Sequence, residues 1–145
     1  MVNLGLLGAG IVIGISAIGS CLGIGYVGQA AIGAWKKCII AGKKASMLML
    51  VLVSIPITQI VYGFLLMEQM KTAAYANPEN AGLYFGFGLT SGLAIGFSAI
   101  IQGKIGACAA DSLGETGKGF ARYIAVIAVV EIIAICVMIL TTVSL

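Results

Sequence analysis

The 145-residue chain contains no histidine, and charged residues make up only 9% of it. No nucleotide-binding motif of the GxxxxGK[ST] type occurs, so we expect no bound nucleotide. The cysteines lack the CxxC spacing of zinc and redox sites, and we interpret them as small apolar packing residues. They are Cys21, Cys38, Cys108 and Cys136. The sequence therefore predicts neither a zinc site nor a disulfide framework.

Apolar residues, in contrast, are abundant and account for 61% of the sequence. In soluble domains the apolar share is about 45–50%, and about a quarter of the residues are charged. A core of this size cannot hide so much apolar surface from water, so lipid must act as the solvent for much of the chain. The net charge of +3 is small, and we expect no nucleic-acid partner.

Long apolar segments predict an all-α membrane protein. A helix crosses the hydrocarbon with about 20 residues, and the segments lack the alternation typical of barrel strands. We expect transmembrane helices over residues 4–35, 45–67, 83–110 and 120–145. We expect two helical hairpins, residues 1–72 and 81–145, within one membrane domain. Residues 1–3 include no basic residue and the apolar run that follows is longer than that of a signal peptide, so we interpret this run as a transmembrane helix.

The connections between the segments predict an orientation. Lysine pairs stand at both ends of residues 36–44, and residues 111–119 also carry charged side chains. Lysine and arginine are typical of cytoplasmic loops. We therefore expect these two connections in the cytoplasm, and we expect both termini and the middle connection outside.

The two halves of the chain form an internal repeat that runs in the same direction. Aligned on each other, the first and third segments share small residues at equivalent positions. Gly8, Gly10, Gly14, Ser20, Gly25 and Gly28 coincide with Gly86, Gly88, Gly92, Ser98, Gly103 and Gly106. In the weaker match of the second and fourth segments, Gln59 coincides with Glu131. The repeat indicates a duplicated hairpin in parallel topology.

Glycines of the first and third segments recur at GxxxG spacing. This spacing lets helix backbones approach closely in lipid. The residues are Gly10, Gly14, Gly19, Gly23, Gly88, Gly92 and Gly96. We expect these two helices to pack against copies of themselves in a homo-oligomer, with the other two helices outside. A tight bundle within one chain is the alternative.

Glu131 is the most informative polar residue. The only other charge in residues 120–145 is Arg122, which lies near one end of that segment. A carboxylate near the middle of a membrane costs about 2.5–3.5 kcal/mol on insertion scales. A chain that keeps such a group is expected to use it to handle a cation or a proton.

Further oxygen-bearing groups lie in the second and third segments. Pro56 has no N–H, which leaves a backbone carbonyl one turn earlier without its helical partner. Around it, one helical face carries Ile55, Thr58, Gln59 and Tyr62, and the third segment adds Gln102. Hard cations take oxygen ligands. One carboxylate among neutral oxygens suits a monovalent ion, so these residues favour Na⁺ over H⁺.

At these residues the chain resembles the rotor-ring proteolipid of V-type ATPases, a duplicated protein known as the c or K subunit. The resemblance covers essentially the whole chain. Residues 55–64 are similar to the Leu-Pro-Gly-Thr-Gln-Gly-Leu-Tyr-Gly-Phe pattern of sodium-pumping bacterial members, and residues 102–107 and 130–131 carry further matching motifs. Departures from the pattern include Ile55 in place of Leu and Ile57 in place of Gly.

The resemblance implies a sodium site and a set of partners. The implied Na⁺ ligands are the Ile55 carbonyl, Thr58, Gln59, Gln102 and Glu131. Tyr62 would hydrogen-bond the Glu131 carboxylate, with Pro56 beside the ligands. The resemblance implies a homo-oligomeric ring in a bacterial plasma membrane and a stator partner, the a or I subunit, with a basic residue facing Glu131. It also implies a central-stalk subunit on the cytoplasmic side and ATP hydrolysis in a separate soluble head.

Other functions stay open at this point. The same ring could carry H⁺ through protonation of Glu131, and the neutral oxygens would then be surplus. A small secondary transporter or channel would predict an inverted repeat or a substrate cavity, and the sequence indicates neither. Glu131 and the face around Pro56 speak against a purely structural or lipid-binding membrane protein.

Overall fold

A computed structural model describes residues 3–145, and over this range the chain is helical with short connections. Met1 and Val2, part of the expected first hairpin, lie outside the described residues. The elements are α1 (Leu4–Ile40), α2 (Leu48–Ser54), the 3₁₀ turn η1 (Ile55–Ile57), α3 (Thr58–Ala76), the 3₁₀ turn η2 (Pro78–Asn80), α4 (Ala81–Thr116) and α5 (Phe120–Val143). Within residues 3–145, four helical spans are long and apolar enough to cross a membrane. The predicted all-α membrane fold is confirmed.

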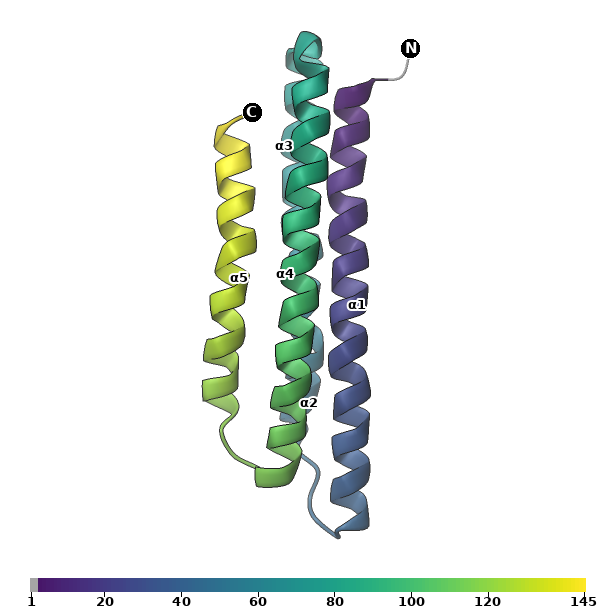
Figure 1. Cartoon of the computed structure of the whole chain (residues 1–145), viewed down its shortest axis with the longest axis vertical. Helices are drawn as coiled ribbons and strands as arrows, with labels where there is room; N and C mark the ends of the chain where they lie inside the picture. Colours follow the sequence, from purple (N-terminus) through teal and green to yellow (C-terminus); the bar gives the residue numbers. More distant parts are fainter. Residues whose placement is uncertain (1–2) are drawn as a thin grey trace.

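The helices form an elongated bundle in which α1 and α4 run side by side in the same direction (Figure 1). The segment from α2 to α3 packs against both of them, and α5 contacts α4 and α3. The connections after α1 and α4 lie at one end of the bundle, and the start of α1 and the C-terminus lie toward the other end (Figure 1). This arrangement is two hairpins related by a parallel repeat.

Helices α1, α3 and α4 continue past the ranges expected from hydropathy, whereas α2 starts three residues later than expected and α5 ends two residues earlier. Helix α1 has 37 residues, and α4 has 36. At 1.5 Å per residue each is roughly 55 Å long, against about 30 Å of hydrocarbon. Most of the charged residues expected in the third connection therefore lie on the last turns of α4. That helix ends at Gly117, whose φ of 66° is the left-handed conformation that commonly terminates helices.

The contact between α1 and α4 depends on glycine. A Cβ atom on Gly88 would meet the backbone of Gly8, and one on Gly19 would meet the backbone of Gly96. Gly23 and Gly92 also lie at this contact. In contrast, a Cβ atom on Gly10 or Gly14 would have nothing within 4 Å. Within one chain, glycine therefore joins the two inner helices to each other and also leaves an open face on α1.

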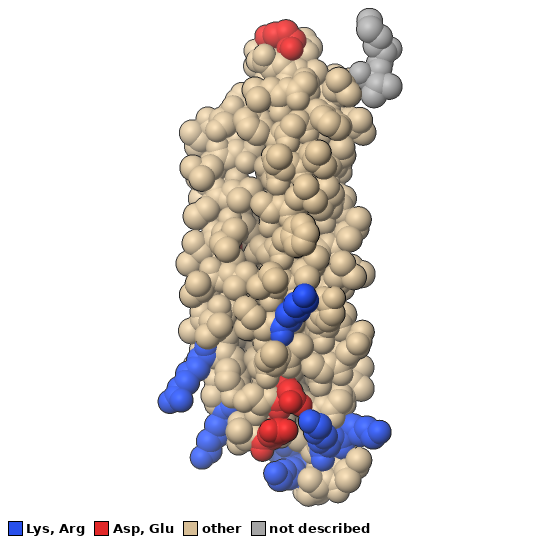
Figure 2. All heavy atoms as spheres, in the orientation of Figure 1, with Lys and Arg blue, Asp and Glu red and all other residues tan. Residues whose placement is uncertain are grey.

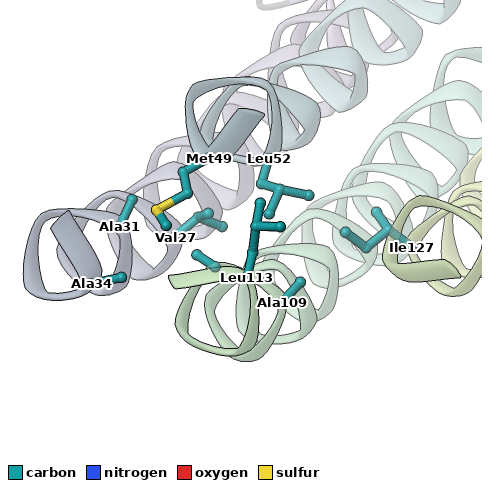
Figure 3. Close-up of a cluster of buried hydrophobic side chains, with 9 residues drawn as sticks. Val27, Ala31, Ala34, Met49, Leu52, Ala109, Leu113 and Ile127 are labelled. Carbon is teal, nitrogen blue, oxygen red and sulfur yellow. The ribbon is translucent and has the colours of Figure 1, made fainter. Parts of the chain in front are cut away.

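Buried apolar side chains form two clusters, one in each half of the bundle. The cluster nearer the connections after α1 and α4 includes Val27, Met49, Leu52, Leu113 and Ile127 (Figure 3). The other includes Val12, Leu66, Tyr84, Ile95 and Ala134. On α1, α3, α4 and α5, the residues between the two clusters include polar ones. They are Ser16, Ser20, Gln59, Ser98, Gln102 and Glu131. The bundle thus has a polar layer at mid-height.

Most of the charged side chains on the visible face lie at the ends of the bundle, and one basic side chain lies closer to mid-height (Figure 2). Basic residues predominate at the end that carries the connections after α1 and α4, where Lys37 pairs with Asp111 at 2.9 Å and with Glu115 at 3.6 Å. The assignment of this end to the cytoplasm stays a prediction.

Candidate ion-binding site

Glu131 lies in the middle of α5 and faces α3. Its Oε1 accepts a hydrogen bond of 2.7 Å from the Tyr62 hydroxyl. Its neighbours Ile132 and Ile133 are 55% and 57% exposed, so they occupy the lipid-facing side of the helix. Because α5 directs its only mid-helix charge toward another helix, the carboxylate is available to a ligand held between α3 and α5.

Pro56 shapes the backbone beside the carboxylate. Helix α2 ends at Ser54, a 3₁₀ turn follows, and α3 starts at Thr58. The Ile55 carbonyl oxygen accepts hydrogen bonds from the backbone N–H of Thr58 and, at 3.0 Å, from its hydroxyl. Since the hydroxyl proton is directed at this carbonyl, the lone pairs of the Thr58 oxygen remain free for a cation.

Ile55, Thr58 and Glu131 line the same groove, which has a volume of about 390 Å³. The groove runs between the segment around η1 and helix α5, and Ser54 and Ile124 also line it. One full negative charge and at least one neutral oxygen therefore border a common space at mid-height of the bundle.

A second polar pair joins α3 to α4. Gln59 Nε2 donates to Gln102 Oε1 at 3.1 Å, and both side chains are fully buried. One atom of each amide, Gln59 Oε1 and Gln102 Nε2, has no hydrogen-bond partner. An unsatisfied buried polar group costs about 1–3 kcal/mol. A free carbonyl oxygen in this position is suited to binding a cation.

The structure arranges the predicted site residues as two neighbouring pairs. Gln59 and Tyr62 are three residues apart on α3, so they lie on one face of the helix. Gln59 bonds to Gln102 on α4, and Tyr62 bonds to Glu131 on α5. Among residues 3–145, no three His, Cys, Asp or Glu side chains cluster as metal ligands. The oxygens that accompany Glu131 are therefore neutral ones.

Two serines at this level were not singled out as site residues from the sequence. Ser98 on α4 donates to the Val130 carbonyl at 3.1 Å, next to Glu131. Ser20 on α1 is buried, and its hydroxyl has no hydrogen-bond partner. Their coincidence in the internal repeat is the one sequence signal that could have drawn attention to both.

Comparison with known proteins gives one family. Residues 7–67 and 85–143 match the family described as the C subunit of ATP synthase. The first match spans most of the hairpin from α1 to α3, and the second spans most of the hairpin of α4 and α5. Because both halves match the same description, the chain contains two copies of one unit. No curated protein matches the chain.

Proposed function

The chain belongs to the ATP synthase C-subunit family, the non-catalytic rotor proteolipids of rotary ATPases, and on this premise we propose that it is the rotor subunit of a sodium-translocating V-type ATPase. Each copy would bind one Na⁺ at Glu131 and carry it across the membrane as the ring turns. The observation that carries the proposal is the Glu131 carboxylate, hydrogen-bonded by Tyr62 and accompanied by neutral oxygens.

Sodium is favoured over a proton by the chemistry of these oxygens. A proton needs only the carboxyl group and at most one hydrogen bond. The buried Gln59–Gln102 pair and the Thr58 hydroxyl would then serve no purpose in the carrier, although burying two amides in a membrane protein is costly. Around Na⁺, the same groups supply the oxygen ligands that a hard cation requires. The proposed ligands are Glu131, Thr58, Gln59, Gln102 and the Ile55 carbonyl, whose oxygen would have to release the Thr58 hydroxyl to bind the ion.

The proposed transport mechanism depends on the net charge of the site with and without Na⁺. With Na⁺ bound, Glu131 belongs to a neutral unit that can face lipid at low cost, whereas the empty carboxylate is an anion that cannot. A basic residue on the stator would attract the empty carboxylate and release the ion there. ATP hydrolysis in the soluble head would turn the ring, so that sites move from one side of the stator to the other.

Ring assembly is supported by the open face of α1. Gly10, Gly14, Gly25 and Gly28 all lack a neighbour within 4 Å of an added Cβ atom, and they recur on one side of the helix. Helix α4 exposes larger side chains, including Phe97 at 62%. In a ring, which uses a head-to-tail interface, the small face of one copy would receive the larger side chains of the next.

Carbodiimide labelling of Glu131 at fixed pH, with and without Na⁺, tests the proposed function. We expect Na⁺ to protect Glu131, because a carboxylate bound to Na⁺ cannot take the proton that the reagent needs. K⁺ at the same concentration serves as the ionic-strength control. Labelling that responds to pH but not to Na⁺ would instead assign the ring to protons.

A further inference from the structure

Ser20 differs from the other buried serine of α1 in what its hydroxyl contacts. Ser16, one turn earlier, donates to the Val12 carbonyl at 2.7 Å. This bond to the preceding turn is the usual arrangement for serine inside a helix. Ser20 is only 4% exposed, yet its hydroxyl makes no hydrogen bond. A polar group left unpaired at mid-membrane requires an explanation.

The packing register of α1 against the segment from α2 to α3 places Ser20 opposite Gln59. Helices α1 and α3 are antiparallel, so residue numbers that increase along α1 face residue numbers that decrease along α3. A Cβ atom on Gly63 would meet Ser16, and one on Gly23 would meet Pro56. Ser20 lies four residues after Ser16, and Gln59 lies four residues before Gly63. The two residues therefore face each other between these contacts.

Helix α4 contributes Gln102 at the same level. Gly23, which follows Ser20 by three residues, contacts α4 at Ala99 and Gly103. Gln102 lies between these two positions in the sequence and is bonded to Gln59. The unpaired atoms at this level are complementary, because a hydroxyl both donates and accepts, Gln59 Oε1 accepts, and Gln102 Nε2 donates.

We propose that Ser20 is a positioning residue of the ion site. In this structure the Ser20 hydroxyl bonds to neither amide. A change of its side-chain rotamer would let it donate to Gln59 Oε1 and accept from Gln102 Nε2, and these two bonds would fix the orientation of both amides. An amide oxygen has two lone pairs, so it can accept this hydrogen bond and still bind a cation. The inference rests on the proposed function, since it assigns Ser20 the task of orienting ligands for the transported ion.

The internal repeat supports this assignment independently. Ser20 coincides with Ser98 in the alignment of the two halves, as Gln59 coincides with Glu131. Ser98 donates to the carbonyl of Val130, directly beside Glu131. Each half of the chain therefore places a serine of its inner helix next to the central polar residue of its outer helix.

Ser20→Ala tests the proposal, with Ser16→Ala as the matched control. Both changes remove one buried hydroxyl from the same face of α1, but only Ser16 already has a backbone partner. The measurement is the Na⁺ concentration that half-protects Glu131 from carbodiimide in the intact complex. We expect this concentration to rise about tenfold in Ser20→Ala, the effect of losing one well-placed hydrogen bond, and less than about twofold in Ser16→Ala.

A double-mutant cycle separates positioning from a general loss of stability. In a Gln59→Leu background, Ser20 keeps only the Gln102 amide to orient, so Ser20→Ala should raise the half-protecting Na⁺ concentration by a smaller factor than it does with Gln59 present. Thermal dissociation of the ring provides the stability control. An equal loss of ring stability in both serine variants with unchanged Na⁺ protection would show a purely structural role and overturn the proposal.

Failure of the sodium proposal can be recognised in the same experiment. If Na⁺ does not protect the unmodified chain, the sodium function fails, and the pH of half-maximal Glu131 labelling is compared instead. A shift of this pH in Ser20→Ala but not in Ser16→Ala then retains the positioning role of Ser20. Identical pH midpoints in both variants and the unmodified chain overturn it.

Discussion

Tyr62→Phe removes the one hydroxyl that bonds directly to Glu131 and keeps the aromatic ring. The lost bond is short, 2.7 Å, and its acceptor is a carboxylate. Hydrogen bonds to charged groups contribute about 1.5–3 kcal/mol. Tyr62 is only partly buried, so we take the lower value, which corresponds to about a tenfold loss of ion affinity. We therefore expect the half-protecting Na⁺ concentration to rise about tenfold in carbodiimide labelling.

Tyr123→Phe is the matched control for this change. The Tyr123 hydroxyl forms a bond of similar length, 2.6 Å, to Ser112, but near the start of α5 and away from Glu131. This variant should keep the Na⁺ dependence of the unmodified chain. If both variants shift the Na⁺ dependence equally, or if Tyr62→Phe leaves it unchanged, Tyr62 does not hold the carboxylate in its binding position.

Three further changes test the site and the packing. Gln102→Ile should greatly weaken the protection of Glu131 by Na⁺ against carbodiimide, while most of the pH-dependent labelling remains. Strong protection by Na⁺ in this variant would show that Gln102 is not a ligand. Gly88→Ala should lower the stability of the chain by about 1–3 kcal/mol, measured by denaturation in detergent, because the added methyl group overlaps Gly8. Gly14→Ala should leave that stability unchanged but weaken ring assembly in native gels, and an intact ring would show that this face of α1 is not an interface.

Hydropathy located the four membrane-crossing helices but not their full lengths. The apolar segments report where lipid surrounds the chain, whereas each helix continues until a local signal ends it. Helix α4 runs on to Thr116 and stops at Gly117, which adopts the left-handed conformation. A charged residue such as Glu115 at the end of a membrane span is compatible with either a helix or a loop, so composition alone could not decide.

Some features of the site could also be predicted from the sequence, whereas others depend on how the helices pack. One helical face around Pro56 and the isolated charge of Glu131 could be recognised from spacing and composition. The bond between Gln59 and Gln102 depends on the register of two helices, which no single-helix pattern contains. The internal repeat marks the position of Ser20, but only the packing shows that its hydroxyl is unpaired, because a lone serine in a glycine-rich helix usually bonds to its own backbone.

Equilibrium binding of radioactive Na⁺ to the purified ring measures directly whether each chain holds a sodium ion at Glu131. We expect one bound Na⁺ per chain at neutral pH. We also expect complete loss of binding in Glu131→Gln and normal binding in Glu68→Gln, which alters a carboxylate that pairs with Lys71 on the same helix. Absence of Na⁺ binding by the unmodified ring, or its persistence in Glu131→Gln, would contradict the assignment of Glu131 as the sodium site.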